Sequence, residues 1–134
     1  HLIYEVTGGN PQALRVVGGQ LVIFGMEEVL ADLREMRSRR VEQLYDHIYR
    51  RAWEGLDPAA RHLLLALAAV DVGGESLDYI VRLAGLDERV VLESIETLVV
   101  RNLVERRLQS NLVRYTIHHL TRSFLYKQIV NWDK

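Results

Sequence analysis

The chain has 134 residues, of which 49% are hydrophobic and 26% charged, and its formal net charge is −1. This length holds one ordinary domain or two small ones, and the composition excludes a disordered chain. The balanced charge provides no overall basic field for nucleic acid or an anionic membrane, and the absence of cysteine excludes disulfide frameworks and thiolate metal sites.

No apolar run reaches the roughly 18–20 residues of a membrane span, and no signal peptide is visible. We therefore expect a cytoplasmic protein that does not contact a membrane. The first residue is His1 rather than Met, so we interpret the chain as a fragment of a longer protein.

The first 55 residues predict an incomplete helical subdomain. Residues 1–6 have the pattern of a helix end, which Gly8 and Gly9 terminate. Asn10 then caps a new helix, and Pro11 occupies its first position, where a missing N–H costs nothing. Its apolar stripe is expected at Leu14, Val17, Leu21 and Phe24.

Glycines at 18 and 19 weaken that helix but allow a neighbouring backbone to approach closely. A second helix is predicted from Met26 to Met36, with Val29, Leu30 and Leu33 on one side. After a polar break at residues 37–40, a third helix runs from Val41 to Trp53 and ends at Gly55. Its apolar positions are Val41, Leu44, Tyr45, Ile48 and Ala52.

The remaining residues, 56–134, begin with three predicted helices. Asp57-Pro58 repeats the cap-plus-proline signal and opens a nearly all-apolar helix over residues 59–70, which we expect at the centre of a core. After a turn at Gly73-Gly74, Ser76 caps a helix over 77–84 that Gly85 ends. Asp87 caps a longer helix over 88–100, and the three-residue turn between these helices is typical of a helix-turn-helix.

Two strands, Leu103 to Leu108 and Leu112 to Ile117, are predicted around a Gln109-Ser110-Asn111 turn. An amphipathic helix from about His119 to Val130 follows. The expected fold is therefore mainly α. It consists of a partial helical bundle, residues 1–55, then a winged helix with a two-stranded hairpin and a C-terminal helix, residues 56–134.

Many winged helices bind DNA, and the predicted recognition helix would be residues 88–100. Its polar side chains include three acids, Glu88, Glu93 and Glu96, against one base, Arg89. This is the wrong sign for a major groove. Arginines 106, 107 and 114 of the hairpin could touch phosphate, but a solvated or protein-facing hairpin explains them better.

Two short motifs, taken with this order of elements, resemble the NB-ARC family of STAND ATPases. This family includes apoptosome adaptors, plant disease-resistance proteins and many bacterial regulators. The run Gly9-Asn10-Pro11-Gln12-Ala13-Leu14 is similar to the family's Gly-x-Pro motif. The run Ile117-His118-His119-Leu120 is similar to its Met-His-Asp motif. The resemblance implies a signal-transduction regulator, which we expect to be bacterial.

The resemblance implies a cofactor-binding role for Gly9, Pro11 and His118. Pro11 would pack against the adenine of ADP or ATP, and His118 would reach the β-phosphate of ADP and hold a closed, inactive state. The partners implied are a nucleotide-binding domain upstream in the same chain and, after activation, other copies of the protein. His119 stands where the family usually has an acid, which puts the strength of this restraint in doubt.

The sequence contains no Gly-x-x-x-x-Gly-Lys-Ser/Thr run and no strand that ends in paired acids. We therefore expect no catalytic residues, no metal site, and no ATPase activity or bound nucleotide in this chain alone. Two alternatives stay open. One is a winged-helix transcriptional regulator with a helical dimerisation segment, and the other is a protein-interaction module without a ligand.

Overall fold

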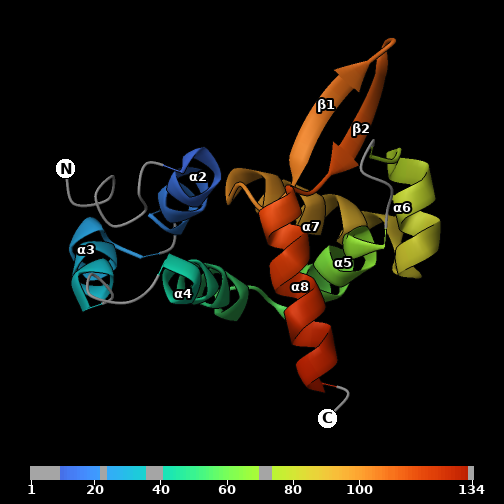
Figure 1. Ribbon diagram of the computed structural model, residues 1–134. Coiled ribbons are helices and arrows are strands. Elements are labelled where there is room, and N and C mark those ends of the chain that lie inside the picture. The colour runs from blue at the N-terminus through green and yellow to red at the C-terminus, as the bar shows by residue number, and fades with distance from the viewer. Residues whose placement is uncertain (1–9, 22–23, 36–40, 70–73, 133–134) are drawn as a thin grey trace. The chain divides into compact units, whose positions relative to one another are not determined.

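The structure is a computed structural model that describes residues 10–21, 24–35, 41–69 and 74–132. Its described residues form helices and one antiparallel hairpin, which confirms the mainly α fold expected (Figure 1). The chain divides into two compact units, His1–Gly55 and Leu56–Lys134. The predictions for residues 1–9, including Gly9, for the break at 37–40 and for Gly73 lie outside the described residues.

The first unit contains three described helices, α2 (Pro11–Gln20), α3 (Met26–Glu35) and α4 (Val41–Glu54). Helix α2 begins where the sequence predicts, because the Asn10 side chain accepts hydrogen bonds from two backbone N–H groups of its first turn. The core of this unit is formed by buried side chains from all three helices. Its largest fully buried members are Val16, Val17, Val29, Leu33 and Ile48.

The buried face of α2 differs from the predicted stripe. Helix α2 ends at Gln20, so Phe24 lies beyond it, and Leu14 and Leu21 are only half-buried. Gln20 is buried instead, because its side-chain amide donates to the Ile48 carbonyl of α4 at 2.8 Å. The expected close approach at Gly18 is wrong, since no atom lies within 4 Å of the position that a Cβ would take.

The second unit is built around α5 (Pro58–Ala68), which contacts α6 (Leu77–Ala84), α7 (Glu88–Val100) and α8 (His119–Trp132). Leu63 and Leu67 of α5 are almost fully buried, which confirms that this helix is central. Asp57 caps it as predicted, accepting the Ala60 N–H at 2.8 Å. The helix ends two residues before the predicted Val70, which lies outside the described residues.

A three-residue turn joins α6 to α7, as the helix-turn-helix pattern predicts. Gly85 ends α6 in the left-handed conformation, with φ of 68°. Asp87 precedes α7 but makes no side-chain hydrogen bond to its first turn, so the predicted cap is wrong in this respect. Its exposed carboxylate is solvated, and its charge still complements the positive end of the helix.

The hairpin consists of β1 (Glu105–Gln109) and β2 (Leu112–Thr116), which pair in antiparallel register from Glu105 opposite Thr116 to Gln109 opposite Leu112. Ser110 and Asn111 form the turn with positive φ values of 49° and 66°, as a two-residue hairpin turn requires. Gln109 is therefore a strand residue.

The first strand also starts later than predicted. The N–H groups of Leu103 and Val104 both donate to the Leu98 carbonyl, so these two buried residues close α7 instead of extending the strand.

The base of the hairpin is anchored by the segment before α6. Glu75 and Tyr115 exchange backbone hydrogen bonds of 3.0 and 2.8 Å. Gly74 has φ of 85°, and a Cβ there would lie 3.0 Å from the Tyr115 carbonyl oxygen. Helix α8 follows the hairpin and packs on α5 through its buried residues Thr121, Phe124 and Leu125 (Figure 1).

Candidate functional site

Pro11 is presented on the surface of the first unit by the cap of α2. The Oδ1 atom of Asn10 accepts from the N–H groups of Gln12 and Ala13, each at 3.0 Å. Pro11 between them has no N–H to satisfy, and its ring is exposed. The result is a rigid apolar surface at the positive end of a helix, next to a fixed polar cap.

His118 lies in the second unit, between the end of β2 and the first residue of α8. Its side chain is half-buried. Its Nδ1 atom accepts a hydrogen bond from the Leu120 N–H at 3.1 Å, and its carbonyl oxygen accepts from the Arg122 N–H at 3.0 Å. His118 is therefore the N-cap of α8.

This hydrogen bond fixes the tautomer of His118. A neutral imidazole has one donor and one acceptor nitrogen. Because Nδ1 accepts the Leu120 N–H, the ring proton is carried by Nε2. The outer nitrogen, Nε2, is thus the donor nitrogen of the ring, and the ring lies at the N-terminus of α8, whose positive potential favours an anion.

His119, at the position where the resemblance leads one to expect an acid, is the first residue of α8 and is exposed. Its ring lies against that of His118, with centroids 4.2 Å apart and an angle of 33° between the planes. It therefore supplies ring contact and no negative charge. Helix capping at this position comes from His118 and not from residue 119.

Two side chains of α8 attach this helix to the C-terminal end of α5. The Arg122 guanidinium and the Tyr126 hydroxyl both donate to the carbonyl oxygen of Ala68, the last residue of α5; the Tyr126 bond is 3.1 Å long. Two donors on one carbonyl satisfy an acceptor that the end of α5 would otherwise leave exposed. The position of His118 in this unit is thus fixed by strand β2 on one side and by α5 on the other.

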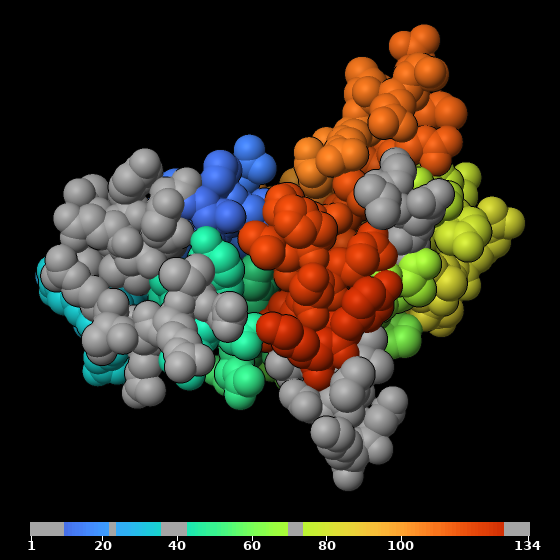
Figure 2. Space-filling model, viewed as in Figure 1, coloured from blue at the N-terminus to red at the C-terminus, as the bar shows by residue number. Residues whose placement is uncertain are grey.

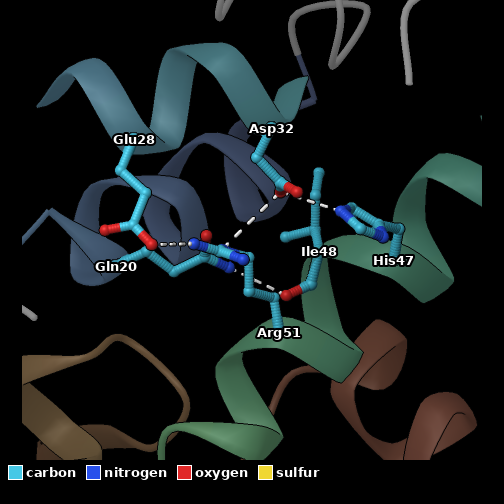
Figure 3. Close-up of polar contacts among 6 residues, drawn as sticks. All are labelled: Gln20, Glu28, Asp32, His47, Ile48 and Arg51. Atoms are coloured by element: carbon cyan, nitrogen blue, oxygen red, sulfur yellow. Dashed lines mark hydrogen bonds and ion pairs between the residues drawn. The ribbon is translucent and has the colours of Figure 1, made fainter. Parts of the chain in front are cut away.

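A polar cluster that the sequence did not lead us to expect joins the three helices of the first unit (Figure 3). The Asp32 carboxylate of α3 lies 2.8 Å from Nε2 of His47 and 3.7 Å from Nε of Arg51, both on α4. Arg51 also contacts Glu28 at 3.0 Å. Figure 3 shows these side chains converging between the helices, beside the Gln20–Ile48 hydrogen bond.

This cluster has a structural role. The Arg51 guanidinium also lies over the Phe24 ring, 4.3 Å from its centroid, so one side chain connects α3, α4 and the segment between α2 and α3. The sequence does contain a signal for it. Glu28 and Asp32 on one helix, and His47 and Arg51 on the next, are both pairs at four-residue spacing, which puts each pair on one face of its helix.

The hairpin arginines are engaged within the second unit. Arg106 pairs with Glu96 of α7 and lies 5.6 Å from the Tyr115 ring centroid. The side chain of Tyr115, and to a smaller extent that of Glu96, raises the pKa of Arg106. Arg107 contacts Glu105 at 3.2 Å, and Arg114 donates to the Gly74 carbonyl at 3.2 Å. These contacts favour a structural role over phosphate binding.

Open hollows are found elsewhere in the second unit. Two of them, of about 310 and 340 Å³, share Arg82 of α6 in their lining, and neither is lined by His118. Among the described residues, no three His, Asp or Glu side chains are grouped as a metal ion would require. In the same part of the chain, no helix is long and apolar enough to cross a membrane.

The fold is a helical bundle followed by a winged helix with an added C-terminal helix. Comparison with protein families, with curated proteins and with solved structures found no match. Pro11 belongs to the first unit and His118 to the second, and each has the local geometry described above.

Proposed function

We propose that this chain is the nucleotide-sensing, regulatory part of a STAND ATPase switch of the NB-ARC type, working in the cytoplasm. An upstream domain would supply the phosphate-binding loop, and Gly9, Pro11 and His118 would contribute contacts to the bound ADP or ATP. The proposal rests on the two motifs in their order along the chain, on the winged-helix fold between them, and on the chemistry of the two described side chains.

The observation that carries the proposal is the hydrogen bond from the Leu120 N–H to Nδ1 of His118. It keeps the proton on Nε2, which is the form of the imidazole that can donate to a phosphate oxygen. A histidine whose outer nitrogen were the acceptor would repel that oxygen. The neighbouring N-terminus of α8 adds further positive potential for an anion.

The surroundings of Pro11 support its proposed contact with the adenine base. An exposed, rigid pyrrolidine ring suits the flat face of a purine, and Pro11 directly follows Asn10, which caps the same helix. Because the two hydrogen bonds to Asn10 fix the start of α2, a base would bind the Pro11 ring at little conformational cost. Stacking on a proline carries little specificity for the base by itself, and the rest of the recognition would come from the upstream domain.

His118 would regulate the switch because it would contact ADP in the closed form and not in the open form. A hydrogen bond to a charged group is typically worth about 1.5–3 kcal/mol, which is one to two decades in an equilibrium constant. If His118 contacts ADP only in the closed form, its loss releases the winged helix and favours opening and assembly with other copies. His119 replaces the acid usual in the family, so either its neutral ring substitutes by hydrogen bonding or the restraint on the closed state is looser here.

The chain alone would neither hydrolyse ATP nor bind ADP tightly, because two contacts do not replace a phosphate cradle. The first test is therefore the sequence encoded upstream of His1. A glycine-rich loop with its lysine and Ser/Thr, followed by a strand that ends in acids, is expected there. If the upstream sequence lacks these motifs, the proposed nucleotide site is wrong. The remaining function is then that of a protein-interaction module.

A further inference from the structure

We draw no further inference here: the strongest candidate, the patch of exposed apolar side chains on α7 and on the hairpin that Figure 2 shows in orange, namely Leu92, Val100, Leu108, Leu112 and Val113, carries nothing, because nothing in the structure shows what covers it.

Discussion

The Leu120 N–H donates to Nδ1 of His118 at 3.1 Å, so one side chain both caps α8 and carries its proton on the outer nitrogen, Nε2. Capping and phosphate contact are often treated as competing explanations for such a histidine. Here they use different ring nitrogens and are compatible. The two roles can therefore be separated by substitutions that imitate one nitrogen at a time.

We predict that His118→Ala destabilises the chain by about 1 kcal/mol, which is the usual cost of losing an N-cap acceptor. His118→Asn should recover most of this loss, because an Asn side-chain oxygen occupies the place of Nδ1 and can accept the Leu120 N–H. Urea denaturation of the three proteins measures the difference. Equal stability of the Ala variant and the wild type would show that the cap contributes nothing.

The two aspartates that precede α5 and α7 should respond differently to alanine. Asp57 accepts the Ala60 N–H at 2.8 Å, whereas Asp87 makes no side-chain bond to its helix. Asp57→Ala should cost about 1 kcal/mol and Asp87→Ala no more than a few tenths, from its charge alone. Thermal unfolding of both variants checks this order, and a larger loss at Asp87 would contradict the assigned capping.

Gly74 and Gly85 should also differ, although both have a left-handed backbone. An added Cβ at Gly85 meets no atom within 4 Å, whereas at Gly74 it would lie 3.0 Å from the backbone oxygen of Tyr115. Gly85→Ala should therefore cost roughly 1 kcal/mol from the backbone strain. Gly74→Ala should lower the free energy of unfolding further, because the base of the hairpin must also move. Chemical denaturation gives both values. Equal losses of stability in the two variants would be evidence against the packing at Tyr115.

Specific binding to duplex DNA is not expected. The hairpin arginines are engaged in contacts with Glu96, Glu105 and the Gly74 carbonyl, and α7 presents acids to solvent. A gel-shift assay at physiological salt should show no sequence-specific complex. A specific complex that is lost in Arg89→Ala would support the transcriptional-regulator alternative instead.

Much of the fold could be predicted from local signals. Asn10-Pro11, Asp57-Pro58 and Ser76 each mark a helix start that the structure contains, because a cap and its helix are neighbours in sequence. The buried face of α2 could not be predicted, since it depends on the Ile48 carbonyl, which is available to Gln20 only when α4 packs beside it. Leu103 and Val104 were mistaken for strand residues because their apolar character serves the closure of α7 equally well.

The candidate site, like the fold, could be predicted from the sequence only in part. The exposure of Pro11 at a helix start follows from the Asn-Pro pair alone. The tautomer of His118 and its contact with the His119 ring depend on where β2 ends and α8 begins, which requires the folded chain. The Asp32–His47–Arg51 cluster needed two facing helices to be recognised, although its four-residue spacings are visible in the sequence.

The central claim is that His118 contacts a bound nucleotide through Nε2, and calorimetric titration of ADP into the full-length protein that carries this chain tests it most directly. His118→Asn keeps the cap and removes the outer donor, so it should weaken ADP binding about tenfold or more with stability retained. His118→Gln, whose amide nitrogen reaches nearer the place of Nε2, should keep much of the affinity while losing the cap. Wild-type ADP affinity in His118→Asn would contradict the claim and leave His118 as a structural cap alone.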